Sequence, residues 1–301
     1  MYKKILIPLD GSKVAETVLP YAREFADNLQ SHVELFSVSE PILAGIHDYV
    51  YSKHHISVDE AIKKQTEDYL NRTSTYFTGL PGTITTQVAT GYPADQIIAE
   101  AKKEPSTLIA MSTHGRSGIG RWALGSVADK VLHSLGTPIL LVRGQEEKPA
   151  QASAKFKNIV MPLDGSATAE ESSAAVMNLA KAMNLSVTLI RVTPSTSSYY
   201  QFSEYPTIDI RNLALEVDSD AQKYLDNMAK KLKTWGVSQV NTSLLHGGAA
   251  DAIIDTAKKL PDSLIVITTH GNSGVKRTLL GSVADRVVSQ SEQPVLVVTA
   301  K

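Results

Sequence analysis

One glycine-rich stretch of the chain combines residue types that could bind an anion. Residues 112–118 read Ser-Thr-His-Gly-Arg-Ser-Gly after an apolar run, and Gly125-Ser126 opens a segment with helical character. Glycines let backbone amides approach an anion closely, and a helix N-terminus presents N–H groups with partial positive charge. The stretch could therefore cradle a phosphate group. It is not a Walker A loop, because it has no Gly-Lys-Ser/Thr triplet.

The same residues also fit a purely structural role. Ser126 and Asp129 have the spacing of a capping box, with the serine as the N-cap of a helix and the acidic residue at N3. Asp129 would also place a negative charge close to a bound phosphate. From these residues alone, an anion site and a capped helix both remain open.

Two further polar residues follow apolar runs. The carboxylate of Asp10, after Ile5–Leu9, could accept a hydrogen bond from a nucleobase amino group or a ribose hydroxyl. An Asx-turn, in which Asp10 bonds the backbone around Gly11 and Ser12, is the favoured interpretation. His114 has no recognisable nucleophile and acid with which to form a catalytic triad, so a loop-stabilising role is favoured for it.

The chain contains an internal sequence repeat of about 150 residues. Residues 4–12 recur as residues 158–166, and residues 114–132 match residues 270–288 with 12 identities in 19 positions. The polar, proline-containing stretch between the copies is typical of an exposed linker. We therefore expect a first domain at residues 1–143, a linker at residues 144–156 and a second domain at residues 157–301.

The repeat bears on a possible metal site. His47, His54 and His55 lie in a loop at residues 42–57, where metal binding is conceivable. The corresponding loop of the second half, at residues 195–212, has tyrosines and a phenylalanine but no histidine. This difference argues against a metal site, and none is predicted.

Composition excludes several classes of protein. The 301 residues include 30 basic and 31 acidic side chains and no cysteine. The balanced charge argues against a nucleic-acid binder, and the absence of cysteine excludes disulfides and thiolate chemistry. No apolar run approaches the roughly 18 residues of a membrane span, and the N-terminus lacks the apolar stretch of a signal peptide. We therefore expect a cytoplasmic protein that binds neither nucleic acid nor membrane.

Short apolar runs alternate with amphipathic stretches in each half. In the first half the predicted strands are residues 5–9, 33–38, 83–89, 107–111 and 138–142, and the predicted helices are residues 14–30, 58–76, 94–103 and 127–135. Continuously apolar runs such as Leu108–Met111 are typical of parallel strands covered on both faces. The pattern predicts an α/β fold with two tandem doubly wound domains. Ligands of such sheets bind beyond the carboxyl ends of the strands, where the strand order reverses.

These motifs together resemble the universal stress protein family. The resemblance rests on residues 7–12, on His114-Gly115 and on Gly125-Ser126-Val127, with nine residues between the last two motifs, and the second half carries the same motifs. It covers both halves almost end to end. It implies five parallel strands in the order 3-2-1-4-5 in each domain, with the two domains paired across their last strands. A homodimer is a further expectation.

One branch of this family binds ATP or AMP, and Mg²⁺ is expected to accompany ATP. The resemblance implies that Asp10 holds the nucleoside side, that the backbone of Val38 reads adenine and that the glycine-rich loop holds phosphates. The implied cofactor-binding residues are Pro8, Asp10, Val38, Met111, Ser112, Gly115, Arg116, Gly125, Ser126 and Val127 in the first domain, and Pro162, Asp164, Val192, Thr268, Gly271, Gly281, Ser282 and Val283 in the second.

The chain departs from the family's nucleotide pattern at one position in each half. Ser112 and Thr268 stand where the pattern has its first glycine. A side chain there could crowd a ligand, or its hydroxyl could contact a phosphate. Arg116 can pair with a phosphate, whereas the matching Asn272 cannot. We therefore expect two unequal sites, with the better one in the first domain.

Three functions are compatible with the sequence. The leading hypothesis is a nucleotide-binding stress-response module that acts as a sensor or regulator. The first alternative is a nucleotide-free interaction scaffold of the same fold. The second is an enzyme, either a slow ATPase or a hydrolase with the middle loop as a lid. Enzymatic activity ranks last and no catalytic residue is predicted, because the only positioned general bases would be Asp10 and Asp164.

Overall fold

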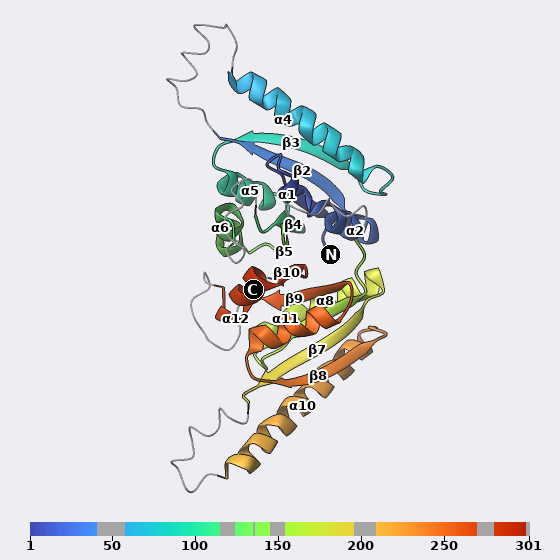
Figure 1. Ribbon diagram of the computed structural model, residues 1–301. Coiled ribbons are helices and arrows are strands. Elements are labelled where there is room, and N and C mark those ends of the chain that lie inside the picture. The colour runs from blue at the N-terminus through green and yellow to red at the C-terminus, as the bar shows by residue number, and fades with distance from the viewer. Residues whose placement is uncertain are drawn as a thin grey trace. The chain divides into compact units, whose positions relative to one another are not determined.

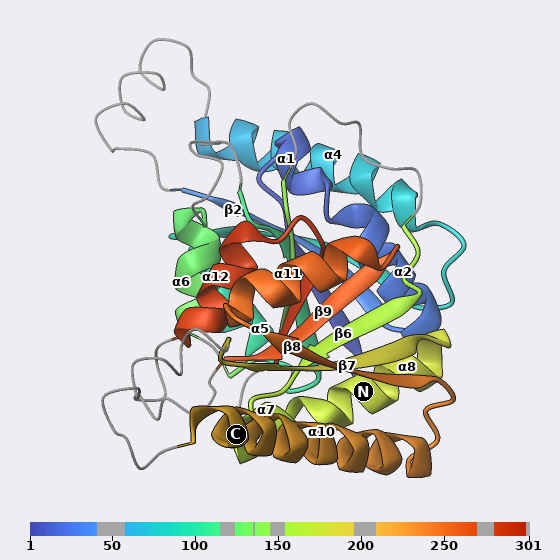
Figure 2. The same ribbon diagram turned by 60° about the horizontal axis from the view of Figure 1, so that its bottom comes forward.

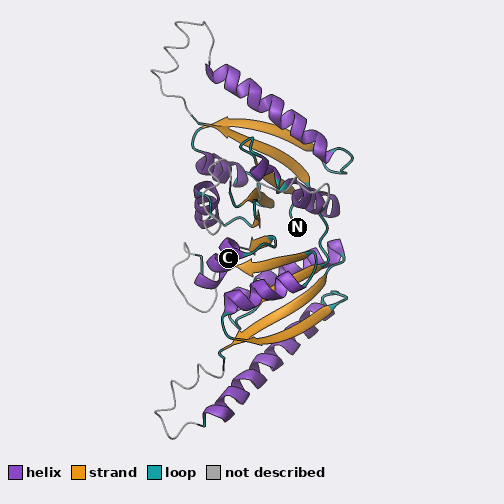
Figure 3. Ribbon diagram, in the orientation of Figure 1, coloured by secondary structure: helices purple, strands orange, loops and turns teal. Residues whose placement is uncertain are grey.

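Two compact units make up the chain. The computed structural model describes residues 1–40, 58–114, 124–134, 136–144, 154–195, 209–269 and 280–298. The first unit, domain 1, is Met1–Ala154, and the second, domain 2, is Lys155–Lys301. Each is an α/β domain in which helices flank the strands (Figures 1 and 3).

The sheet of domain 1 is parallel throughout, with the strand order β3-β2-β1-β4-β5. Its strands are β1 (Lys4–Pro8), β2 (His32–Ser39), β3 (Ile84–Thr90), β4 (Thr107–Ser112) and β5 (Ile139–Val142). The predicted doubly wound order is therefore confirmed. The order reverses between β1 and β4, so the segments that follow these two strands lie at the same edge of the sheet.

Helices connect these strands. They are α1 (Lys13–Glu16), α2 (Leu19–Leu29), α4 (Val58–Ser74) with the 3-10 turn η1 (Thr75–Phe77), α5 (Pro93–Ala101) and α6 (Ser126–Ser134). The single helix predicted over residues 14–30 is wrong, because two helices occupy this segment. Pro20 lies in the first turn of α2. Proline has no N–H and is tolerated only in the first turn of a helix, so it favours a new helix start here.

Domain 2 repeats the arrangement. Its strands, in the order β10-β9-β6-β7-β8, are β6 (Asn158–Pro162), β7 (Ser186–Thr193), β8 (Val240–His246), β9 (Ser263–Thr268) and β10 (Val295–Val298). Its helices are α7 (Ala167–Glu170), α8 (Ser172–Met183), α10 (Ile210–Thr234), α11 (Ala249–Lys259) and α12 (Ser282–Gln290). Helix α11 packs on β6 and β9 (Figure 2). Among the helices of the described ranges, none has the length and apolar character needed to cross a bilayer.

The central strands carry the core of each domain. Every residue of β4 is buried, and so is every residue of its counterpart β9. Apolar side chains on both faces of a parallel strand require a layer of helices on each side. The continuous apolar runs seen in the sequence are therefore explained by burial on both faces of the sheet.

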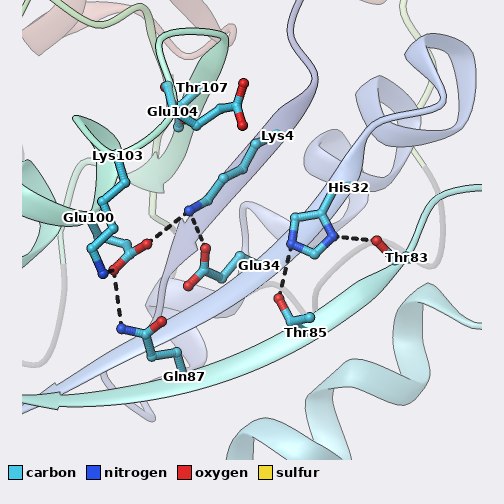
Figure 4. Close-up of polar contacts among 10 residues, drawn as sticks. All are labelled: Lys4, His32, Glu34, Thr83, Thr85, Gln87, Glu100, Lys103, Glu104 and Thr107. Atoms are coloured by element: carbon cyan, nitrogen blue, oxygen red, sulfur yellow. Dashed lines mark hydrogen bonds and ion pairs between the residues drawn. The ribbon is translucent and has the colours of Figure 1, made fainter.

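A buried ion cluster lies at the amino end of the domain 1 sheet (Figure 4). Lys4 Nζ forms ion pairs with Glu34 of β2 and, at 3.0 Å, with Glu100 of α5. The Glu100 carboxylate also accepts hydrogen bonds from Gln87 Nε2 at 3.1 Å and from Lys103 Nζ at 2.6 Å. The side chains of Lys4, Glu34 and Glu100 are only 12%, 7% and 6% exposed. We call these five residues the Lys4 cluster.

Domain 2 has uncharged residues in place of the three buried charged residues of this cluster. Asn158 takes the place of Lys4, and Thr188 and Thr256 take the places of the two glutamates. Asn158 Nδ2 donates to the carbonyl of Pro261 at 2.7 Å, and the Thr256 hydroxyl donates to the carbonyl of Ala252 at 2.8 Å. Among the described residues, buried charges therefore lie at this end of the sheet in domain 1 and not in domain 2.

The Lys4 cluster predicts a difference between the domains in acid. Burial alone would raise the pKa of Glu100, but hydrogen bonds from Lys103 and Lys4 outweigh it and lower that pKa below its ordinary value of 4.5. A carboxylate with a lowered pKa stabilises the fold above its ordinary pKa, and this contribution is lost as the pH falls through the folded-state pKa. We expect domain 1 to lose stability relative to domain 2 between about pH 5 and about pH 3. Hydrogen exchange measured by mass spectrometry would detect this loss in each domain. Equal acid sensitivity in wild-type protein and in Glu100→Gln would contradict this expectation.

Candidate functional site

A tight turn follows β1. Asp10 Oδ1 accepts hydrogen bonds from the Ser12 N–H at 2.9 Å and from the Ser12 hydroxyl at 2.6 Å. Gly11, between them, has a φ of +84°, a conformation that glycine adopts without strain. The Ser12 hydroxyl oxygen in turn accepts from the Ala15 N–H at 3.1 Å and caps α1. Asp10 therefore forms the Asx-turn predicted from the sequence.

Domain 2 has the same turn after β6. Asp164 Oδ1 accepts from the N–H and the hydroxyl of Ser166, at 2.9 and 2.6 Å. Ser166 caps α7 through the Ala169 N–H at 3.1 Å. The two turns differ in exposure, because Asp10 is half-buried whereas Asp164 is exposed. One sequence motif thus builds one local structure in two different environments.

Strand β2 extends further than β1. The pairing of β2 with β1 ends at Pro8 and Phe36, and the Leu9 N–H donates to the Phe36 carbonyl at 2.8 Å. The pairing of β2 with β3 continues as far as Ser39. The last residues of β2 therefore extend past the end of β1 and have no strand beside them on that side.

This overhang directs the backbone of Val38 toward the end of β1. The N–H and C=O groups of one strand residue point to the same side, and successive residues alternate between sides. Phe36 bonds on the β1 side, and the Ser39 carbonyl accepts on the β3 side from the Gly91 N–H at 3.0 Å. Val38, two residues after Phe36, therefore presents its N–H and C=O groups above the end of β1.

Val192 has the same position in domain 2. The Leu163 N–H donates to the Ile190 carbonyl at 2.8 Å, and the Gly247 N–H donates to the Thr193 carbonyl at 2.9 Å. By the same alternation, the backbone groups of Val192 are directed above the end of β6. Each domain thus presents one backbone donor and one backbone acceptor beside its Asx-turn.

The segment after β4 is tied to the start of α6. The Gly125 N–H donates to the carbonyl of Thr113 at 2.8 Å, and the Thr113 N–H donates to the carbonyl of Val142 at 2.8 Å. A Cβ on Gly125 would lie 3.1 Å from the Thr113 carbonyl oxygen, which is a tight contact. Glycine at this position therefore lets the start of the helix approach the end of the strand closely.

The helices start one residue earlier than the predicted capping box requires. The N-cap of α12 is Gly281, with φ −63° and ψ 147°, and it makes no side-chain cap bond. Its carbonyl accepts from the Asp285 N–H at 2.9 Å, and Gly125 accepts from Asp129 in the same way at 2.8 Å. The predicted N-cap role of the serines is therefore wrong. The glycine takes that position, and Ser282 is the first helical residue.

This shift leaves N–H groups at the sheet edge. The first N–H groups of a helix have no partner within the helix. In α6 they include those of Ser126 and Val127, and in α12 those of Ser282 and Val283. Both serines are exposed at the helix surface. Each helix start therefore offers the partial positive charge and the donors that an anion requires.

The side chain that replaces the first glycine of the family pattern is packed within domain 1. Ser112 is 5% exposed, and its hydroxyl oxygen accepts from the His114 N–H at 3.4 Å. A Cβ added to Gly144 would collide with the side chains of Ser112 and Val14. The extra side chain is thus accommodated by a glycine in the segment after β5. Thr268, its counterpart, is also 5% exposed.

His114 lies beside these groups. Its Nδ1 is 3.0 Å from the Thr113 hydroxyl oxygen, which also accepts from the Gly144 N–H at 3.4 Å. The bond from Gly144 to Thr113 joins the ends of β4 and β5, and the His114 ring contacts the same hydroxyl. His114 Nε2 is buried and makes no hydrogen bond within the part of the chain that the structure describes.

Comparison with known proteins identifies the family. The profile of the universal stress protein family matches residues 1–143 and again residues 155–299. The chain belongs to the universal stress protein family. Universal stress protein MJ0531 of Methanocaldococcus jannaschii is 36% identical over 143 residues, which are 48% of this chain and 82% of that protein. A universal stress protein of Mycolicibacterium smegmatis is 22% identical over 309 residues, covering 98% of this chain and 96% of its own length.

A solved structure shows the same tandem fold. The crystal structure of a universal stress protein from Archaeoglobus fulgidus is 19% identical to this chain and covers 99% of both chains with a TM-score of 0.73. The agreement extends over both domains. The tandem arrangement inferred from the internal repeat is therefore an architecture that universal stress proteins adopt.

Sequence reasoning missed one charged residue at the site of domain 2. Arg191 of β7 lies over the ring of Tyr224, 4.9 Å from its centroid. The Tyr224 hydroxyl donates to Glu170 Oε1 at 3.2 Å, as the Tyr69 hydroxyl does to its glutamate in domain 1 at 3.3 Å. Aligning the two halves could have found it. At the spacing of 154, Arg191 corresponds to Ser37, so a charged residue in one half replaces a neutral one in the other.

Several predicted site residues lie outside the described part of this universal stress protein. They are Gly115, Arg116 and Gly271, together with Asn272, His270 and the histidines of the loop at residues 42–57. Within the described ranges, no group of three or more histidine and acidic side chains is arranged to hold a metal ion. In both domains the Asx-turn, the last residues of the second strand and the helix start lie at the carboxyl edge of the sheet.

Proposed function

We propose that this universal stress protein binds an adenine nucleotide, AMP or ATP, in each domain and acts as a nucleotide-dependent regulator rather than an enzyme. The observation that carries the proposal is the grouping of binding elements at one sheet edge. Asp10, the Val38 backbone and the start of α6 follow or flank β1 and β4, between which the strand order reverses. This is the place where doubly wound sheets bind their ligands.

The phosphates belong at the helix start. With Gly125 as N-cap, the N–H groups of Ser126 and Val127 are available and the serine hydroxyl is not needed for capping. Amides, a hydroxyl and the helix dipole together favour an anion at this position. The buried Nε2 of His114 supports the same assignment, because buried polar atoms normally find a partner. ATP would bring Mg²⁺ to these phosphates.

The base belongs beside Val38. Adenine carries an exocyclic amino donor next to a ring-nitrogen acceptor. The Val38 carbonyl and N–H, directed above the end of β1, form the complementary pair. Asp10 then borders the nucleoside, with one carboxylate oxygen already fixed by Ser12. Domain 1 is proposed as the tighter AMP site, because its aspartate is half-buried whereas Asp164 is exposed.

Isothermal titration of nucleotide-stripped protein tests the proposal. AMP and Mg-ATP should each give saturable heat, with two sites per chain. cAMP, which is bound in a solved universal stress protein 19% identical to this chain, is a useful third ligand. The proposal would be overturned if none of the three ligands gives heat at about 1 mM. A Kd of about 1 mM corresponds to a binding free energy of about −4 kcal/mol. Phosphate release above background would instead favour the ATPase alternative.

A further inference from the structure

Domain 2 holds a pre-oriented cation at its Asx-turn. A Cβ placed on Gly165, in the middle of the turn, would lie 3.1 Å from Arg191 Nη1 and 3.2 Å from Nη2. The guanidinium also stacks on Tyr224, which is held by its hydrogen bond to Glu170. The guanidinium of Arg191 therefore touches the backbone of the turn that carries Asp164, and the aromatic ring limits its freedom to move.

This cation has no acidic partner in the described part of the chain. Within that part, no carboxylate lies within ion-pairing distance of Arg191. The nearby Glu170 accepts from Tyr224 and pairs with Lys231 at 3.4 Å. A guanidinium carries five N–H donors and no acceptor, so it is satisfied by acceptor atoms, best of all by anionic ones.

Domain 1 has no arginine at the position that corresponds to Arg191. Its tyrosine and glutamate are kept, with Tyr69 donating to Glu16 at 3.3 Å. Ser37, however, stands at the position of Arg191 and is 5% exposed. The nucleoside end of the proposed site is therefore bordered by a guanidinium in domain 2 and by a small neutral side chain in domain 1.

We propose that Arg191 makes domain 2 select ligands that present acceptor atoms at the nucleoside end of the site. This inference rests on the proposed nucleotide function. Two ligand features supply the required chemistry, namely a phosphate on the ribose and the O6 and N7 acceptors of guanine. The amino group of adenine is a donor and does not complement a guanidinium. Domain 1, with Ser37, lacks this selectivity.

The test compares three ligands on three proteins. AMP, GMP and adenosine 3′,5′-bisphosphate are titrated into wild-type protein, Arg191→Ser and Arg191→Lys, and the amide signals of Val38 and Val192 report the two domains separately. A bidentate guanidinium contact discriminates by about 10- to 100-fold. We expect domain 2 of the wild type to prefer GMP or the bisphosphate over AMP by this factor. Arg191→Ser, which introduces the residue of domain 1, should abolish the preference of domain 2.

The two ligand sources and the two proposals are separable. Arg191→Lys keeps the positive charge but loses the planar, two-pronged donor group of the guanidinium. A preference for the bisphosphate should therefore survive this substitution, whereas a preference for GMP should be lost. If domain 2 binds AMP with no preference, or keeps its preference in Arg191→Ser, the inference is overturned while the nucleotide function stands. If none of the three ligands binds domain 2, both fail. Domain 1 serves as the internal control and should show no dependence on residue 191.

Discussion

Ser126→Asp combined with Ser282→Asp is expected to abolish nucleotide binding while both domains stay folded. Each serine is the first residue of its helix. An aspartate there adds a negative charge where the phosphate would lie, and two unit charges about 4 Å apart repel by about 4 kcal/mol near a protein surface. Binding should fall by more than about 100-fold, as measured by isothermal titration. The same charge favours the helix, since it faces the positive end of the dipole.

A matched variant separates position from charge. Ser134→Asp adds the same charge to the last residue of α6, where the side chain is also exposed. It should bind nucleotide in domain 1 as the wild type does, although it opposes the helix dipole by about 0.3–1 kcal/mol. If the double variant is folded and binds as tightly as the wild type, the phosphates do not lie at the helix starts.

Lys4→Met is expected to destabilise domain 1 selectively. It leaves Glu34 and Glu100 buried, with side chains 7% and 6% exposed, and removes the cation between them. Removing one partner from a buried ion pair costs about 3–5 kcal/mol, because the remaining charge stays out of water. The free energy of unfolding, measured by urea denaturation with hydrogen exchange resolved by domain, should fall by this amount in domain 1 only.

Two variants test the cause of this loss. Lys4→Met with Glu34→Gln and Glu100→Gln has no buried charge left and should recover most of the stability. Lys157→Met breaks a different pair, with Asp262 at 2.6 Å, whose side chains are 65% and 41% exposed. It should cost domain 2 no more than about 1 kcal/mol. A Lys4→Met protein as stable as the wild type would show that the cluster does not hold domain 1 together.

The fold was predictable because its signals are local and repeated. Continuous apolar runs identify β4 and β9, which are fully buried. The internal repeat then predicts the same order of elements in both halves. The boundaries were less predictable. The helix expected over residues 14–30 is divided at Thr17 and Val18, because Pro20 favours the first turn of a new helix.

The start of α6 shows why part of the site could not be predicted. Glycine and serine are both acceptable N-caps, so Gly125-Ser126 is ambiguous when only neighbouring residues are considered. The hydrogen bond from Gly125 to Thr113, which joins segments separate in the sequence, decides between them. The Lys4 cluster depends in the same way on tertiary contact, because Lys4 and Glu100 are 96 residues apart.

The most direct measurement of the central claim is an AMP titration of the ¹⁵N-labelled protein, followed by NMR at each backbone amide. If nucleotide binds at the sheet edge, the largest shifts will fall on the helix starts and on the overhanging strand residues. These amides belong to Val38, Ser126, Val127, Val192, Ser282 and Val283. Saturable binding that leaves these six amides unmoved would contradict the account, and so would the absence of any shift at saturating AMP.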